Sequence, residues 1–219
     1  LRVTGRRADG YHTLHTRMQK VGLFDLLEVQ RGGEGVRLHC VGADLPENAD
    51  NLVHRAASLF LETVAQRRGR TLGGVKISLT KNIPIAAGLG GGSSDAAALL
   101  GWLNGHVATP LSSQALAHVA LGVGADVPFF LHNRPCRVRG IGEIIEPADL
   151  NFSGLRLVLV CPEIQVSTAQ IFADFDAFSA GSHTGEKQNY LTRAHSRANG
   201  TFLSQGRFDA DLGNDLESV

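Results

Sequence analysis

The sequence has few cysteines, no net charge and no long apolar run. Its three cysteines, Cys40, Cys136 and Cys161, are odd in number and far apart without a C-x-x-C pair, which argues against a disulfide framework and a thiolate zinc site. Lys plus Arg equals Asp plus Glu at 21 each, so nothing in the charge suggests nucleic acid or a membrane surface as a partner. No apolar stretch approaches the roughly 20 residues that span a bilayer, and residues 1–7 lack a signal-peptide core. We therefore expect a cytoplasmic protein with a small-molecule ligand.

The residues that are present have the composition of a folded globular protein. Hydrophobic residues make up 43% and charged residues 19% of the 219 residues, well away from disordered or collagen-like classes. At about 100 to 200 residues per domain, this length allows one large domain, or one domain and part of a second. A turn-rich stretch at 147–153 places the boundary near residue 150. We expect one domain over 1–150 and part of another over 151–219.

Apolar periodicity predicts a mixture of helices and strands. Helices are expected at 51–67, 93–104 and 112–121, and strands at 1–3, 24–29, 36–40, 75–80, 137–145 and 155–160. Gly32 and Gly33 separate the strands at 24–29 and 36–40, which suggests that these two form a hairpin. Large apolar residues become sparse from 174 to 213, so that part is expected to be loop or loosely helical.

A glycine-rich segment connects the strand at 75–80 to the helix that starts at Ser93. It consists of Pro84, Ile85, Ala86, Ala87, Gly88, Leu89, Gly90, Gly91, Gly92, Ser93 and Ser94. Glycines let backbone amides converge on phosphate oxygens without side chains in the way. The first turn of a helix adds unpaired, partially positive N–H groups. The segment therefore predicts a nucleotide-phosphate-binding loop, and with it a small-molecule kinase or the larger part of one.

The alternative for this segment is a glycine-rich turn before a serine-capped helix. Four glycines followed by two serines favour phosphate binding over that alternative. No Lys follows the glycines, which excludes the loop G-x-x-x-x-G-K-[ST]. Ser93 stands where a dinucleotide fingerprint has Gly or Ala, so the loop is of a third kind.

Residues 81–97 resemble the second motif of the galactokinase, homoserine kinase, mevalonate kinase and phosphomevalonate kinase superfamily. Three more stretches, GRRADGYH at 5–12, GADVP at 124–128 and GIGE at 140–143, resemble one family within it, the 4-diphosphocytidyl-2-C-methyl-D-erythritol kinases. The similarity runs from residue 1 to about residue 172. It implies transfer of the ATP γ-phosphoryl group, with Mg²⁺, to the 2-hydroxyl of the methylerythritol moiety in the non-mevalonate isoprenoid pathway.

By this resemblance, Asp126 is the catalytic aspartate. Such a carboxylate can accept the hydroxyl proton as the oxygen attacks, while catalysis otherwise rests on positioning and charge stabilisation. The alternative from local sequence alone is an N-cap for a helix that is entered through Pro128. The two roles are compatible with each other.

The resemblance also implies which residues hold the cytidine end of the substrate. Tyr11 and His12 match two of these positions, and an aromatic face beside a polar ring is suited to stacking on and hydrogen bonding a base. Alone, such a pair is more often ordinary packing. Thr168 and Phe172 match the other wall of the cytidine site, although Ala169 stands where many members have Pro.

Asn51 and Lys81 match positions that line the adenine pocket of the family. Taken singly, Asn51 could equally be a helix cap and Lys81 a solvated surface charge. The spacing of His12 and His15 resembles a metal pair but lacks further ligands. No metal site made by protein side chains is expected.

Two motifs of the family are not found in this sequence. One is an initial strand bearing P-A-K-[LI]-N-L, whose Lys neutralises charge near the transferred phosphoryl group, and the other is a glycine-rich loop near the C-terminus. We expect the chain to be a fragment, weakly active or inactive by itself. The implied fold is α+β, with an S5-like nucleotide-binding N-terminal domain and an incomplete ferredoxin-like C-terminal domain.

Two other functions remain alternatives. The first is another kinase of the same superfamily, against which the residues DGYH at 9–12 argue. The second is a nucleotide-binding or nucleic-acid-binding module without catalysis, and the absence of a basic stripe argues against nucleic acid. Whether the protein forms a homodimer is left open.

Overall fold

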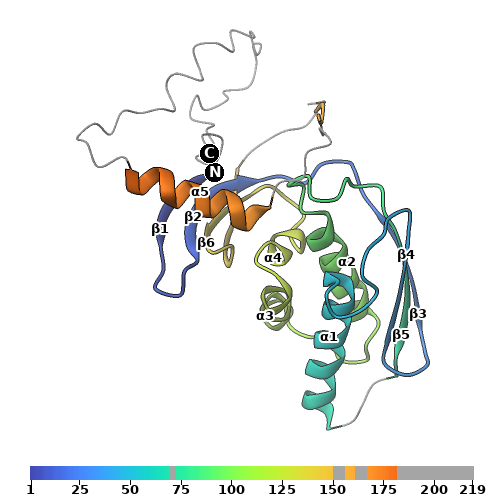
Figure 1. Ribbon diagram of the computed structural model, residues 1–219. Helices are drawn as coiled ribbons and strands as arrows, with labels where there is room; N and C mark the ends of the chain where they lie inside the picture. The colour runs from blue at the N-terminus through green and yellow to red at the C-terminus, as the bar shows by residue number, and fades with distance from the viewer. Residues whose placement is uncertain (70–72, 150–155, 161–166, 182–219) are drawn as a thin grey trace.

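The computed structural model describes residues 1–69, 73–149, 156–160 and 167–181. Within them the chain forms two sheets and five helices (Figure 1). In chain order the elements are β1 (Arg2–Arg6), β2 (His12–Met18), β3 (Leu26–Arg31), β4 (Val36–Val41), α1 (Leu52–Arg68), β5 (Val75–Thr80), α2 (Gly91–Gly105), α3 (Ser113–Val123), α4 (Val127–Phe130), β6 (Cys136–Gly140), β7 (Ile144–Pro147) and α5 (Thr168–Gly181). The α+β fold class expected from the sequence is confirmed over this part of the chain.

One sheet has three strands in the order β3-β5-β4, with β5 antiparallel to β3 and parallel to β4. The hairpin expected between the strands at 24–29 and 36–40 is therefore wrong, because β5 lies between them. The inward-facing residues of β5, Val75, Ile77 and Leu79, are at most 3% exposed. A strand this apolar is best covered at the centre of a sheet, flanked by a neighbour on each side.

The glycines that suggested the hairpin turn make another close contact. The Gly32 amide donates to the Gly74 carbonyl at 2.8 Å, and the Gly74 amide donates to the Gly33 carbonyl at 2.8 Å. A Cβ on Gly74 would lie 2.4 Å from the Gly35 carbonyl oxygen, so no larger residue fits there. These contacts hold the β3–β4 connection against the start of β5.

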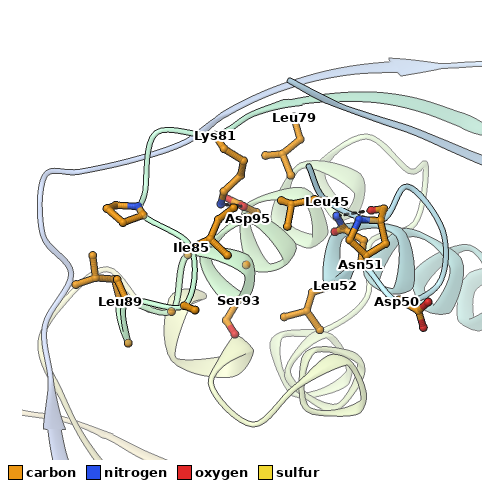
Figure 2. A pocket seen from close by; sticks show the side chains of 18 residues that line it. Leu45, Asp50, Asn51, Leu52, Leu79, Lys81, Ile85, Leu89, Ser93 and Asp95 are labelled. Atoms are coloured by element: carbon orange, nitrogen blue, oxygen red, sulfur yellow. Dashed lines mark hydrogen bonds and ion pairs between the residues drawn. The ribbon is translucent and has the colours of Figure 1, made fainter. Parts of the chain in front are cut away.

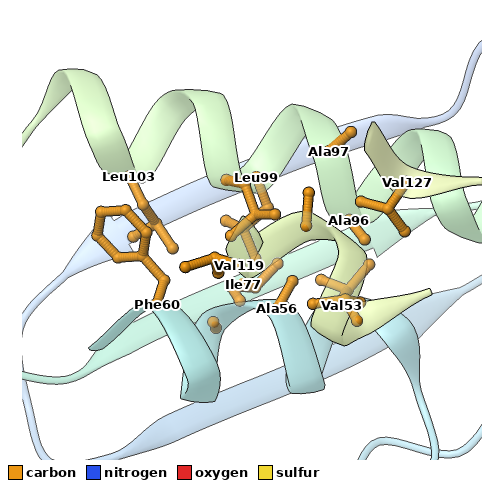
Figure 3. Packing of buried hydrophobic residues seen from close by; sticks show 14 of the residues in the cluster. Val53, Ala56, Phe60, Ile77, Ala96, Ala97, Leu99, Leu103, Val119 and Val127 are labelled. Carbon is orange, nitrogen blue, oxygen red and sulfur yellow. The ribbon is translucent and has the colours of Figure 1, made fainter. Parts of the chain in front are cut away.

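The main core lies between this sheet and helices α1 to α4 (Figures 1 and 3). Phe60 of α1, Leu99 of α2 and Val119 of α3 are at most 4% exposed and face Ile77 of β5 (Figure 3). Fully buried alanines occur in both α1 and α2, the helix pair with the most mutual contact. Small side chains allow two helix backbones to approach closely, which sets the position of α2 and of the loop before it.

The helix predictions are confirmed to within a few residues because their local signals are strong. Helix α1 begins after Asn51, whose side chain caps it, and ends at Gly69 in the left-handed conformation. Helix α3 begins after Ser112, whose side chain accepts a hydrogen bond from the Ala115 amide. Helix α2 begins at Gly91, two residues earlier than expected, so the last two loop glycines belong to its first turn.

The second sheet has the order β1-β2-β6-β7 and is antiparallel throughout. A small cluster of Phe129, Cys136 and Val138 packs between it and α4. The single strand expected at 137–145 is instead a hairpin of β6 and β7. Gly140 and Gly142 adopt φ angles of +70° and +122°, which reverse the chain where continuous alternation in the sequence suggested one strand.

Helix α5 packs beside β1 and β2 (Figure 1) and corrects another expectation. Residues 174–181 are helical, although a loop or loose helix was expected from 174 onward; the remainder of that range, 182–213, lies outside the described residues. The strand expected at 155–160 is also wrong for 156–160, which have no regular structure and no pairing strand among the described residues. The domain boundary expected near residue 150 falls at the edge of the described residues, since 150–155 lie outside them.

Candidate nucleotide site

The glycine-rich segment forms one wall of a cleft of about 330 Å³ (Figure 2). Every residue from 84 to 93 lines this cleft, as do Asn51 and Lys81. The structure thus brings together the loop and the two residues expected at the adenine pocket. Ser94 is the one expected loop residue outside the lining; its amide donates to the Gly90 carbonyl at 2.9 Å, inside the helix.

The loop presents a helix N-terminus with unsatisfied amides to the cleft. Helix α2 is capped by Gly90, which has a φ of +65° and no side chain with which to occupy the first-turn N–H groups. The first turn carries no acidic residue that would compete with a bound anion. The alternative of a serine-capped helix is therefore wrong, since Ser93 and Ser94 lie inside the helix. This arrangement suits a phosphate group.

The opposite end of the cleft is apolar, with Leu45, Leu52 and Leu79 in its lining (Figure 2). Asn51 lies among them and is 9% exposed. Its Oδ1 accepts from the Val53 amide at 2.9 Å, and its Nδ2 donates to the Pro46 carbonyl at 2.9 Å. Asn51 is thus the helix cap that the sequence left as an alternative. Asn51 forms part of the cleft wall, while its polar side-chain atoms are hydrogen-bonded to the backbone of Pro46 and Val53.

Lys81 is buried, so the alternative of a solvated surface charge is wrong. Its Nζ donates to Asp95 Oδ2 on helix α2 at 2.8 Å (Figure 2). The same Nζ also donates to the Asp25 carboxylate. The side chains of Lys81, Asp25 and Asp95 are 6%, 0% and 5% exposed, respectively. They form a buried network, the Asp25–Lys81–Asp95 triad, at the base of the loop.

The triad shifts the pKa values of its two carboxyls in opposite directions. Burial is the largest influence on Asp95 and raises its pKa to about 6, with the Asp25 carboxylate adding to the rise and Lys81 opposing it. Burial also disfavours ionised Asp25, but hydrogen bonds from Lys81, Ile83 and Asn82 outweigh it and lower the pKa of that carboxyl. The two carboxylates likewise outweigh the effect of burial on Lys81 and raise its pKa, so the ammonium stays charged.

Sequence reasoning missed both carboxylates of the triad. Leu26 of β3 pairs with Thr80 of β5, so Asp25 and Lys81, the next residues outward, face each other across the two strands. An acidic and a basic residue just beyond the paired ends of two neighbouring strands predict an ion pair, provided that the strand pairing is known. The signal was hidden because β3 was expected to pair with β4.

Asp126 lies at the N-cap position of α4, but its side chain makes no capping hydrogen bond. The side chain reaches solvent, while partial burial raises the pKa of its carboxyl. Helix α4 also adjoins the glycine loop, since a Cβ on Gly90 would lie 3.1 Å from the Phe130 ring. On its other side, a Cβ on Gly142 would lie 2.6 Å from the Ala125 carbonyl oxygen. The motifs at 84–94, 124–128 and 140–143 therefore converge in space.

Two of the four residues expected at the cytidine end come together between β2 and α5. The rings of His12 and Phe172 stack with centroids 4.7 Å apart, and His12 Nε2 lies 2.7 Å from Asp176 Oδ1. Tyr11 is 60% exposed, and Thr168 is exposed at the first turn of α5. Asp176, which also forms an ion pair with a neighbouring arginine of β1 at 3.0 Å, was missed. It lies in the part of α5 that was expected to be loop or loosely helical.

Two searches of the described residues bear on other ligand classes. None of the helices there is both long and apolar enough to cross a membrane. In the same residues, no three His, Cys, Asp or Glu side chains gather closely enough to hold a metal ion. The chemistry that the described cleft supports is anion binding at a helix N-terminus beside an apolar wall; Asp126 is not among its lining residues.

Comparisons with known proteins agree with this geometry. Residues 51–134 match the family model described as the GHMP kinases N terminal domain. The chain is 41% identical over 219 residues to a 4-diphosphocytidyl-2-C-methyl-D-erythritol kinase of Syntrophus aciditrophicus, covering all of this chain and 72% of that protein. It is 41% identical over 172 residues to a protein of the same name from Clostridium botulinum, covering 78% of this chain and 59% of that protein.

The fold has a counterpart among solved structures. A crystal structure of 4-(cytidine 5'-diphospho)-2C-methyl-D-erythritol kinase superposes with a TM-score of 0.56 at 42% sequence identity. The superposition covers 71% of this chain and 56% of that one. The chain thus spans between 56% and 72% of the length of these three relatives.

Proposed function

Since this chain belongs to the 4-diphosphocytidyl-2-C-methyl-D-erythritol kinase family of GHMP kinases, we propose that it carries the nucleotide site of an enzyme that phosphorylates the 2-hydroxyl of that substrate with ATP. The observation that carries this proposal is the uncapped N-terminus of α2 at the glycine loop, which adjoins α4, the helix that begins after Asp126. Phosphoryl transfer needs a cradle for the triphosphate and a group that accepts the hydroxyl proton. The cleft offers a cradle, and the carboxylate lies on the helix that adjoins the loop.

In the proposed reaction, the amides of the glycine loop hold the ATP phosphates. The substrate oxygen forms a bond to the γ-phosphorus, the bond from that phosphorus to the β–γ bridging oxygen breaks, and ADP leaves. Asp126 accepts the proton of the attacking hydroxyl. Partial burial raises the pKa of its carboxyl, which makes the carboxylate a stronger proton acceptor than an exposed one.

Mg²⁺ is part of the proposal as the partner ion of ATP, where it would neutralise charge on the phosphates. Mg²⁺ is usually held by phosphates, water and one or two protein oxygens, so it would be held mainly by the nucleotide. The Ser93 hydroxyl, which lines the cleft, is a neutral oxygen available to it. No residue of the triad is needed for this purpose.

For the substrate we propose that His12, Phe172, Tyr11 and Thr168 hold the cytidine end. The stacked rings of His12 and Phe172 and the exposed Tyr11 ring support this, because aromatic faces suit a pyrimidine base. We also propose that the protein has two domains and lies in the cytoplasm. The free thiols of Cys40 and Cys136 are in keeping with a reducing compartment.

The test replaces Asp126 with Ala or Asn in the full-length protein. We expect a loss of about 10²- to 10⁴-fold in turnover, because one proton-accepting group is removed, while ATP affinity stays near that of the parent. Glu146→Gln, in an exposed pair with Arg139, is the control and should retain full turnover. Unchanged turnover in the Asp126 variants would contradict the proposed proton transfer. Competition by cytidine nucleotides, but not by homoserine or mevalonate, separates this family from its relatives.

A further inference from the structure

We propose that Asp25 is a positioning residue of the nucleotide cleft, which holds Lys81 and the start of the glycine loop in place through one buried carboxylate. The inference rests on the proposed function, since it concerns the same cleft. Asp25 does not line the cleft itself. It acts through residues 81–83, the segment that leads from β5 into the loop.

The carboxylate of Asp25 accepts three hydrogen bonds from consecutive residues. Oδ2 accepts from Lys81 Nζ, while Oδ1 accepts from the Asn82 amide and, at 2.8 Å, from the Ile83 amide. The side chain is 0% exposed, so these donors replace water completely. A buried carboxylate with charged and amide donors makes strong, directional bonds, and losing any of them leaves a buried group unsatisfied.

These hydrogen bonds lie just beyond the end of the β3–β5 ladder. The last pair of the β3–β5 ladder is Leu26 with Thr80, so residues 81–83 have no ladder partner on the β3 side. The Asp25 side chain attaches residues 81–83 to the end of β3, three residues beyond the last ladder pair. Pro84, the first residue of the loop, follows directly. The carboxylate thus determines the direction in which the loop leaves the sheet.

Asp25 also fixes the side chain of Lys81 within the cleft. The ammonium is held between the Asp25 carboxylate at the sheet and Asp95 on α2, both of which are almost fully buried. A Cβ on Gly91 would lie 3.0 Å from the Ile83 side chain, so the positions of Ile83 and the first turn of α2 depend on each other. Through Lys81 and Ile83, Asp25 links the strand end to the phosphate-binding turn.

Two substitutions distinguish the hydrogen bond to Lys81 from the hydrogen bonds to the Asn82 and Ile83 amides. Asp25→Asn keeps one carbonyl oxygen for the Asn82 and Ile83 amides but turns an NH₂ group toward the Lys81 ammonium. Asp25→Ala removes all three bonds. Asn104→Ala is the matched control, because the Asn104 side chain also holds a loop by two backbone hydrogen bonds, at 2.7 and 3.1 Å to Leu111, at the far end of α2.

The experiment measures ATP affinity by titration and backbone amide exchange by NMR on the full-length protein. For Asp25→Asn we expect ATP affinity to fall about tenfold, from the loss of one charge-assisted bond, with the Asn82 and Ile83 amides still protected. For Asp25→Ala we expect a larger loss of affinity and exchange of those two amides at least about tenfold faster. Asn104→Ala should change ATP affinity by less than about twofold despite a lower melting temperature.

The outcomes separate this inference from the proposed function. If the parent protein binds ATP and both Asp25 variants bind it equally well, the inference is wrong while the proposed function stands. If the parent does not bind ATP, the proposed function fails, and amide exchange alone decides on Asp25. In that case, unchanged protection of Asn82 and Ile83 in Asp25→Ala overturns the inference, and lost protection supports it. An equal loss of affinity in Asn104→Ala also overturns it, because the effect would then be one of general stability.

Discussion

Replacing Asp95 with Asn should change how the stability of this protein depends on pH. Asp95 is a buried carboxyl of the triad, and its pKa is raised from 3.8 to about 6, chiefly by burial. The folded state therefore binds this proton more tightly than the unfolded state does. The resulting stability is fully present below about pH 4 and is lost as the pH rises through about 6.

The size of the effect follows from the two pKa values. A rise from 3.8 to about 6 corresponds to about 3 kcal/mol at 1.36 kcal/mol per unit. Asn at position 95 stays neutral at every pH and can still accept a hydrogen bond from Lys81. Between about pH 4 and pH 8, the free energy of unfolding of the parent should thus fall by about 3 kcal/mol relative to the variant. For a chain of this size, that is a difference of roughly 6 to 12 °C in melting temperature.

The assay is urea or thermal unfolding of both proteins at several pH values across that window. The difference between the two curves isolates Asp95, because the pKa of Asp25 is lowered and its own contribution is lost only at more acidic pH. Glu146→Gln, at an exposed carboxylate, should give a curve parallel to that of the parent. Parallel curves for the parent and Asp95→Asn would refute the reasoning, since they would mean that Asp95 ionises in the folded protein as easily as in the unfolded chain.

Two further predictions concern the loop and helix α5. Gly90→Ala should lower stability by about 1–3 kcal/mol and weaken ATP binding, because Gly90 has a φ of +65° and its Cβ would crowd the Phe130 ring. Gly101→Ala, with nothing within 4 Å of its Cβ, should instead stabilise α2 by up to about 1 kcal/mol; equal losses in both variants, measured by unfolding and ATP titration, would contradict this. Asp176→Ala should release α5 from β2 and speed amide exchange over 168–181, because it removes the bond to His12. Asp174→Ala, whose partner Gln170 lies in the same helix, should leave that exchange largely unchanged, and no difference between the two variants would argue against docking by Asp176.

Sequence patterns predicted the elements whose signals are local. Helices α1 and α3 have side-chain caps at Asn51 and Ser112, and their apolar residues recur at the helical period, so their positions were readable. The glycine loop was readable for the same reason, because its chemistry depends on backbone freedom at consecutive residues. In the described part of the chain, residues 84–93 line one cleft together with Asn51 and Lys81, and Ser94 does not.

Two of the three failures have a different cause, since each depended on a partner distant in the sequence. The order β3-β5-β4 was missed because burial of the apolar β5, rather than the glycines between β3 and β4, decides which strands pair. The β6–β7 hairpin was missed because alternation continues across a turn made by Gly140 and Gly142. Residues 168–181 form a helix that rests on β2 through His12, a contact that no local pattern reveals.

The sequence by itself determined the boundaries of α1 and α3 to within two residues and the glycine-rich loop before α2, because caps and glycine dihedrals act over only a few residues. Only the tertiary structure decided which charged groups meet. Lys81 and Asp25 are 56 residues apart, and His12 and Asp176 are 164 residues apart, yet each pair is in contact. Such pairs form when burial of apolar strands and helices places two chain segments side by side. The site therefore takes its chemical groups from local sequence and their arrangement from the packing of the core.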